Sequence, residues 1–342
     1  MRSEMIGATR WLRGLALAGI AALGLVTIVG SGGGAGFLGS ICDTYPSSCL
    51  PPPPPPPSTS IEPAYITAQV GATVTYTVAT SNFTGSLSYQ WRRSSDGGST
   101  FVEIPGATGQ TYSLGSVNLG DDGALFAATV RGSNGTASSS RGHLAVSSSP
   151  GVVFQDAEFL PADWVVSPLP DPGQAAFVHT EERMPEGGNP GAFRKMFFQI
   201  PPAAGWARLF YLSKSAAYDP ASHGAIYVID YSEDCIALQG SEFAFTNSSL
   251  VIEQGGRRYV ADIAISENCM SPTWSAAASR ASLGVQDFVL VDGPACATGE
   301  SCPDFSSSAL PLQFGYRRIS FGTAGDSIAH GIDNWKVTVW RR

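Results

Sequence analysis

The segment ATVTYTVAT, residues 72–80, shows the pattern on which the fold depends. Val74, Tyr76 and Val78 alternate with threonines, so in an extended strand the three apolar side chains share one face. Short strands and turns of this kind predict an antiparallel β-sandwich over residues 61–148. The other strands and hairpin turns of this region are SLSYQWRR (86–93), ALFAATVRG (124–132), SDGG (95–98) and SNGT (133–136).

Three segments of this region resemble a known protein family. GATVTYTV, YQWRRSSDGG and DDGALFAATVRGSNGTASS are similar to the bacterial immunoglobulin-like domain of the I-set kind. The resemblance implies that Trp91 is the buried tryptophan of the third strand. It also implies that Asp121, Gly123 and Phe126 form the turn before the sixth strand, where Phe126 replaces a tyrosine and its hydroxyl hydrogen bond is lost. A module of this family is expected to serve as a spacer or an interaction surface, with no chemistry of its own.

The resemblance also bears on how this region is stabilised. Val78 and Ala128 stand where the family often has its two inter-sheet cysteines. A disulfide at this place typically contributes about 2–4 kcal/mol. Packing around Trp91 is therefore expected to hold the first sandwich without a disulfide.

Residues 152–342 predict a second and larger all-β unit. Strand-like segments recur along it, and the best helix candidate is a turn or two at 275–284. One all-β unit of this length suggests a two-sheet jelly roll. The fold class is therefore all-β, with two tandem antiparallel sandwiches behind an N-terminal signal or anchor helix. The strand-like segments are KMFFQI (195–200), WARLFYLS (206–213), GAIYVIDYS (224–232), RRYVADIAI (257–265), QDFVLV (286–291), PLQFGYRRISF (311–321) and DNWKVTVW (333–340).

This second region also resembles a known superfamily. FQDAEFLPADW (154–164), EGGNPGAFRKMFFQI (186–200) and the closing residues Gly331, Ile332, Asp333, Asn334 and Val337 look like the concanavalin A-like, or laminin G-like, jelly rolls. The resemblance implies that the closing strand pairs with the first. The superfamily includes lectin-like binders, glycosidases and modules without a ligand, so it leaves the function open.

The N-terminal residues predict an export signal. Three arginines in residues 1–13 precede the uncharged segment GLALAGIAALGLVTIVG (14–30). Cleavage near residues 31–36, retention as a membrane anchor, and a lipoprotein at Cys42 all remain open, although Gly39 and Ile41 fit a lipobox poorly. We expect an exported protein of the bacterial periplasm, cell surface or medium, with membrane contact only through residues 1–36.

Residues 37–60 form a linker. Pro51–Pro57 is an unbroken run of seven prolines. As polyproline II at about 3.1 Å per residue it would be a stiff spacer roughly 22 Å long.

Six cysteines are consistent with export, because disulfides persist in oxidising compartments. Their spacing predicts the pairs Cys42–Cys49 and Cys296–Cys302, which leaves Cys235 for Cys269. The spacing does not fit a zinc site.

Charge excludes one class of partner. Of 342 residues, 14% are charged and the formal net charge is −8. Nucleic-acid binding needs a basic stripe, and none is visible, so we expect no nucleic-acid partner.

The sequence has no catalytic signature. The carboxylates closest together, Asp230, Glu233 and Asp234, read as the solvated end of a strand rather than as a glycosidase pair. Oxygen ligands for calcium could come from Asp219 and Asp230, or from Asp326, Asp333 and Asn334, but turn chemistry explains them better. We therefore predict no enzyme, no metal and no cofactor.

Aromatic side chains are the candidate ligand contacts, because sugars stack on aromatic rings. Alternation places Tyr227 and Tyr231 on one strand face, and Trp335 on a core face with Val337 and Val339. Trp274, after Cys269, is the best solvent-facing aromatic. The candidates are Trp206, Tyr218, Tyr227, Tyr231 and Trp274.

These residues predict a non-enzymatic adhesion or glycan-recognition protein, with the jelly roll binding a glycan or surface-protein ligand. The alternatives are a purely structural envelope protein and, third, a glycan-active hydrolase.

Overall fold

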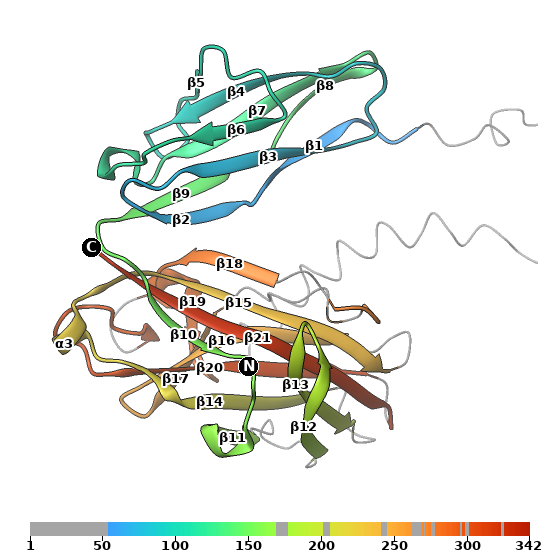
Figure 1. Cartoon of the computed structure of the whole chain (residues 1–342), viewed down its shortest axis with the longest axis vertical. Coiled ribbons are helices and arrows are strands. Elements are labelled where there is room, and N and C mark those ends of the chain that lie inside the picture. Colours follow the sequence, from blue (N-terminus) through green and yellow to red (C-terminus); the bar gives the residue numbers. More distant parts are fainter. Residues whose placement is uncertain are drawn as a thin grey trace, which may run out of the picture. The chain divides into compact units, whose positions relative to one another are not determined.

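The computed structural model contains two β-sandwiches built from separate sheets (Figure 1). The chain divides into two compact units, and every described strand lies in the second, Pro57–Arg342. Because this unit is not divided further, the predicted boundary at residues 148–152 stays a prediction. The structure describes residues 54–168, 177–200, 206–240, 245–261, 269, 271–274, 278–294, 296–297, 301–322 and 325–342.

The first sandwich has the topology of an immunoglobulin-like domain. Its two sheets have the strand orders β1-β3-β6 and β2-β9-β7-β4-β5, with β8 added to β7. Strand β2 runs parallel to β9, and all other pairs are antiparallel. The first strand, β1, thus lies in one sheet, and the next strand, β2, lies in the other. The strands are β1 (Ser58–Glu62), β2 (Tyr65–Gln69), β3 (Val74–Ser81), β4 (Ser88–Ser94), β5 (Val102–Glu103), β6 (Thr111–Leu114), β7 (Leu125–Gly132), β8 (Gly135–Ser138) and β9 (Gly142–Ser147).

The core of this sandwich confirms the alternation seen in the sequence. Val74, Tyr76 and Val78 are buried on one face of β3. Trp91 is 0% exposed, and its indole nitrogen donates to the Gly109 carbonyl at 2.9 Å. Phe126 is also fully buried, in the place where the family has tyrosine. Burial of large apolar side chains stabilises this sandwich.

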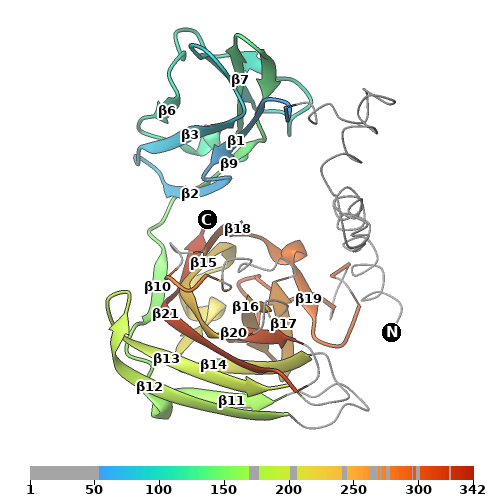
Figure 2. The same cartoon turned by 90° about the vertical axis from the view of Figure 1, so that its right-hand side faces the viewer.

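The second sandwich consists of two six-stranded sheets, and all its strand pairs are antiparallel (Figures 1 and 2). Their orders are β12-β13-β21-β15-β18, with β10 paired to β21, and β11-β14-β20-β16-β17-β19. The first and closing strands, β10 and β21, are neighbours, as the sequence predicted. The strands are β10 (Val152–Asp156), β11 (Trp164–Pro168), β12 (Val178–Gly188), β13 (Gly191–Gln199), β14 (Trp206–Tyr218), β15 (Ile226–Gln239), β16 (Phe245–Gln254), β17 (Arg257–Ala261), β18 (Ala278–Leu283), β19 (Phe288–Leu290), β20 (Leu312–Phe321) and β21 (Ser327–Arg341).

The helix predicted at 275–284 is wrong, because Ala278–Leu283 is the edge strand β18. Alanine and serine there are compatible with a helix, but pairing with β15 decides the conformation. The short helix α3 (Pro220–His223) lies in the turn before β15.

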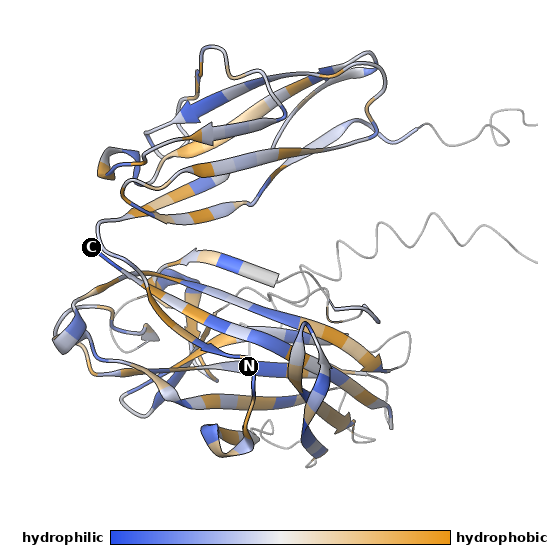
Figure 3. Ribbon diagram, viewed as in Figure 1, coloured by the Kyte–Doolittle hydropathy of each residue, from blue (hydrophilic) through white to orange (hydrophobic). Residues whose placement is uncertain are grey.

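Hydropathy alternates along the strands, so each sheet has a core face and an outer face (Figure 3). Trp335, Val337 and Val339 lie in the core, as predicted. Among the described helices, none has the length and apolar composition to cross a membrane. The apolar segment 14–30 and the proline residues 51–53 lie outside the described residues.

Candidate functional site

A groove opens at one end of the second sandwich. It lies between the β16–β17 hairpin and the loop residues 302–310, and its volume is about 1050 Å³. Ligand sites for small molecules usually measure about 300–1,000 Å³. Its polar lining comes from Gln254, Arg257, Gln286, Asp304 and Ser306.

One wall of the groove is held in place by hydrogen bonds. The buried side chain of Gln254 donates to the carbonyls of Asp304 and Leu310, both at 2.8 Å, and accepts from the Asp304 amide at 2.8 Å. The Ile226 amide donates to the Phe305 carbonyl at 2.9 Å. Because these contacts satisfy the loop's own backbone, the wall is organised before a ligand arrives.

The groove offers hydrogen-bonding groups on an apolar floor. Asp304, Ser306 and Gln286 are exposed at its rim, whereas Tyr259 and Phe305 are 3% and 6% exposed. Buried rings of this kind form the floor and present no open ring face. Among the described lining residues, Asp304 carries the one carboxylate, so no pair of carboxylates faces across the groove.

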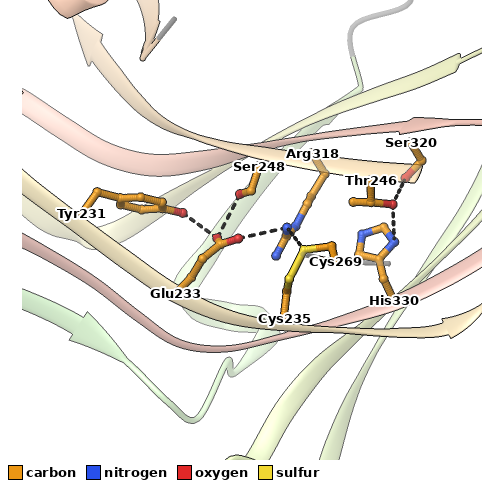
Figure 4. A network of polar contacts seen from close by, with 9 residues as sticks. All are labelled: Tyr231, Glu233, Cys235, Thr246, Ser248, Cys269, Arg318, Ser320 and His330. Carbon is orange, nitrogen blue, oxygen red and sulfur yellow. Dashed lines mark hydrogen bonds and ion pairs between the residues drawn. A yellow bond between two sulfur atoms is a disulfide. The ribbon is translucent and has the colours of Figure 1, made fainter. Parts of the chain in front are cut away.

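A network of polar groups lies inside the sandwich, between its two sheets (Figure 4). Glu233 and Arg318 are both 0% exposed, and the carboxylate and guanidinium atoms lie 3.0 Å apart. Tyr231 and Ser248 donate to Glu233 at 2.6 and 2.9 Å. Burial and the Glu233 charge hold the pKa of Tyr231 well above its ordinary value. Glu233 is thus a structural carboxylate that no substrate reaches.

A second group of buried polar contacts joins His330, Thr246 and Ser320 (Figure 4). The Nδ1 atom of His330 lies 3.3 Å from the hydroxyl of Thr246. Burial, followed by the charge of Arg318, holds the pKa of His330 well below its ordinary value. The imidazole is therefore neutral at pH 7 and serves packing rather than proton transfer.

The other two carboxylates of the predicted cluster point elsewhere. Asp230 lies on the outer side of β15 and accepts from Thr67, the Ser282 amide and the Trp340 indole at 2.7–2.8 Å. Burial raises its pKa. Asp234 instead accepts the side-chain amide of Asn334 at 2.7 Å. The prediction that these three carboxylates form a solvated strand end is therefore wrong, because Glu233 and Asp234 are buried. Their three separate surroundings also do not form a catalytic pair.

The residues considered for calcium have turn and packing roles. Asp219 is the N-cap of α3 and accepts from the Ala221 amide at 3.1 Å. Asp333 accepts from the backbone amides of Asn189 and Asn334, which ties the β12–β13 turn to β21. The Asp326 carbonyl accepts from the Ile200 amide at 2.8 Å. In the described part of the chain, His, Cys, Asp and Glu nowhere gather in threes as a metal site.

Tyr227 and Tyr231 do not share a strand face, contrary to the simple alternation. A β-bulge between Ile226 and Val228 shifts the register of β15 against β21. The extra residue reverses the alternation. Tyr231 therefore points into the core at 1% exposure, while the Tyr227 hydroxyl donates to Asp122. Tyr231 is therefore not available as a ligand contact.

The remaining aromatic candidates are also engaged in packing. The indole of Trp274 donates to the Gly187 carbonyl at 2.9 Å and meets the Phe193 ring edge-on at 5.3 Å. Tyr218 is 1% exposed and donates to the Gly224 carbonyl. Trp206 begins β14, and its side chain lies outside the described residues. Tyr218 is therefore closed to a ligand, whereas Trp274 is half-buried.

Two of the three predicted disulfides are present, Cys235–Cys269 and Cys296–Cys302. The third pair, Cys42 and Cys49, lies outside the described residues. Disulfides are typical of proteins in an oxidising compartment, outside the cytoplasm.

Sequence reasoning missed the groove. Gln254, Gln286 and Asp304 belong to no motif, and they come together only because a hairpin and a distant loop meet. The doublet of cysteines at 296 and 302 was the one signal that this loop is held in a defined shape.

Comparisons with known proteins add little information about the function of this chain. No protein-family model and no curated protein matches the chain. Among solved structures, it is similar to one described as the structural basis for Dscam isoform specificity, at 22% identity over 27% of this chain and 21% of that chain, with a TM-score of 0.22. The N-terminal four Ig domains of Dscam1 isoform 4.44 match at 18% identity, with the same coverage and TM-score.

A third similar structure concerns T cell specificity and activation by the bacterial superantigen toxic shock syndrome toxin-1. It matches at 10% identity over 27% of this chain and 99% of that chain, with a TM-score of 0.23. This chain spans about a fifth of the length of the Dscam chains. TM-scores of this size carry no argument about function.

Proposed function

We propose that this chain is a non-enzymatic, exported recognition protein whose second sandwich binds a glycan in the groove beside Gln254. The observation that carries the proposal is the preorganised groove, whose rim offers amide, carboxylate and hydroxyl groups. Sugar hydroxyls pair with groups of this kind, and the apolar floor suits the C–H faces of a sugar ring.

The remaining parts fit this role. The two disulfides support an oxidising location. The first sandwich would act as a spacer or a partner surface, and residues 1–60 as signal or anchor and linker. Membership of the second sandwich in the concanavalin A-like superfamily belongs to the same proposal.

The test is glycan-array binding by the full chain, with calcium and again with EDTA. The variant Gln286→Ala/Asp304→Ala removes two rim groups while leaving the backbone contacts of Gln254 in place. The matched control is Gln239→Ala, an exposed glutamine outside the groove. We expect hits that survive EDTA and are lost in the rim variant alone. A blank array, or hits that both variants retain, contradicts the groove assignment.

The structural alternative has one specific observation in its favour. Tyr218 and Tyr231 are buried, and Trp274 is half-buried against Phe193, so none of these described candidates is a fully exposed ring of the kind that many lectins use for stacking. A blank array together with a stable, folded chain would put a purely structural envelope role first.

A further inference from the structure

The outer face of the β2-β9-β7-β4-β5 sheet carries a group of arginines around one phenylalanine. The guanidinium carbons of Arg92 and Arg141 lie 6.0 and 5.6 Å from the centre of the Phe101 ring. Arg92 pairs with Ala127 across the β4–β7 ladder, and Arg131 lies four residues further along β7. Because side chains alternate along a strand, Arg131 lies on the same face as Arg92. Trp91 and Ala128, which pair on the opposite face, are in the core.

Within the described part of the chain no ion pair joins these arginines to an acid, although Glu103 stands opposite Arg92 in the β4–β5 ladder and so lies on the same face. Arg93, one residue along β4, forms the ion pair with Asp121 at 2.8 Å. Besides its contact with Phe101, the Arg92 side chain donates through Nη2 to the Ser138 hydroxyl at 3.5 Å, and its Nε has no hydrogen-bond partner among the described residues. In a chain of net charge −8, a face with unpaired arginines is an unusual concentration of positive charge.

The position of Arg141 depends on a glycine. Gly98 has a φ of +89°, and a Cβ placed there would lie 2.6 Å from the Arg141 guanidinium. The β4–β5 turn therefore leaves room for this side chain to lie against its backbone. The exposed Arg141 is thus held beside Phe101 rather than left extended in solvent.

We propose that this face, formed by Arg92, Phe101, Arg131 and Arg141, binds a linear acidic polysaccharide such as a polyuronate. Guanidinium groups pair with carboxylates through two parallel hydrogen bonds, and two of them lie against the Phe101 ring. Arg131 lies four residues further along β7, so positive charge recurs along the strand direction, which suits a ligand that repeats its charge along its length. This site is separate from the groove of the second sandwich, and either can exist without the other.

The position on a sheet face favours a polysaccharide over an acidic peptide. A peptide adding to a sheet uses main-chain hydrogen bonds at an exposed strand edge. Here β4 and β7 are hydrogen-bonded on both sides, to β5 and β7 and to β4 and β9, so their backbone groups are occupied. A polyuronate needs only its carboxylates.

The test is binding of polygalacturonate to the full chain, with uncharged dextran, poly-glutamate and duplex DNA as further probes. We expect binding of polygalacturonate that weakens steeply with added salt, because exposed charge pairs are screened. The variant Arg92→Gln/Arg141→Gln should lose at least tenfold in affinity. The control Arg183→Gln/Lys214→Gln has the same net charge, alters the half-buried Arg183 and the exposed Lys214 of the second sandwich, and should bind like the unchanged chain.

A second pair of measurements separates binding from folding. Arg92→Lys/Arg141→Lys keeps the charge but not the bidentate geometry, and should bind more weakly than the unchanged chain with the same salt dependence. Circular dichroism shows whether each variant is folded. Three results would each overturn the proposal. The first is an equal loss of affinity in the control variant, and the second is binding of poly-glutamate or DNA as tight as that of polygalacturonate. The third is no binding of polygalacturonate by the unchanged chain.

Discussion

Replacing Arg318 by methionine should destabilise the second sandwich far more than the same change at Arg317. Arg318 and Glu233 are 0% exposed, and their charged atoms lie 3.0 Å apart. The variant leaves Glu233 in the interior with two neutral donors, Tyr231 and Ser248, and no opposite charge. Removing one partner of a buried ion pair costs about 3–5 kcal/mol, because the remaining charge keeps its desolvation penalty. We expect a loss in this range at pH 7.

The double variant Glu233→Gln/Arg318→Met provides the internal check. A glutamine carbonyl still accepts from Tyr231 and Ser248, while the uncompensated charge is gone. Replacing a buried ion pair by neutral groups is often close to neutral in stability. The double variant should therefore recover about 2 kcal/mol or more of what the single variant lost.

The assay is urea unfolding at pH 7 with the disulfides intact, followed by far-UV circular dichroism. Arg317 is half-buried on the outer side of β20 and donates to Ser249 at 3.1 Å, so Arg317→Met should cost no more than about 1 kcal/mol. Equal midpoints for the two single variants would refute the reasoning. A double variant no more stable than Arg318→Met would do the same.

Three further outcomes follow from the contacts described above. Gln254→Ala leaves backbone groups of Asp304 and Leu310 unpaired, which costs about 1 kcal/mol for each group. Amide hydrogen exchange at residues 303–310 should therefore accelerate. Unchanged protection of these amides would contradict the role assigned to Gln254. Burial raises the pKa of Asp230 above its unfolded value of about 3.9, so the unchanged chain loses stability as pH rises through the folded pKa. The variant Asp230→Asn lacks this loss. Between pH 3 and 7 the unfolding free energy of the variant should therefore rise relative to that of the unchanged chain. Parallel profiles of unfolding free energy against pH would argue against this reasoning. Trp91→Ala should cost about 3–5 kcal/mol in a sandwich without a disulfide, measured as a lower thermal midpoint, and an unchanged midpoint would count against the packing argument.

Local sequence patterns were enough to predict the elements whose neighbours are close in sequence. They were also enough to predict the strands whose apolar and polar side chains alternate strictly between the two faces. Val74, Tyr76 and Val78 are buried together because period two matches the pleat of β3. Trp335 is buried for the same reason on β21. The prediction at 275–284 was wrong because its composition allows helix and strand alike, and pairing with β15 decided between them.

The candidate site was harder to predict than the fold. Simple alternation put Tyr227 beside Tyr231, and a bulge of one residue separated them. Trp274 is half-buried, and its contacts with Phe193 and Gly187 of the β12–β13 hairpin were not predicted. A bulge and a long-range contact leave no periodic trace in a sequence, so neither could be read from the residues alone.

The sequence by itself determined the β-class, the alternating core faces, the closing strand against the first, and two of the cysteine pairs. The core faces depend on short-range periodicity, and the cysteine pairs on spacing and on which cysteines remain. The pairing of the closing strand was instead implied by the resemblance of residues 331–337 to the concanavalin A-like superfamily. Only the tertiary structure decided that Glu233 is neutralised inside the sandwich by Arg318, that Gln254 fixes the wall of a groove, and that Arg92 and Arg141 meet at Phe101. Each of these depends on residues distant in sequence, whose interaction energies exist only once the sheets have brought them together.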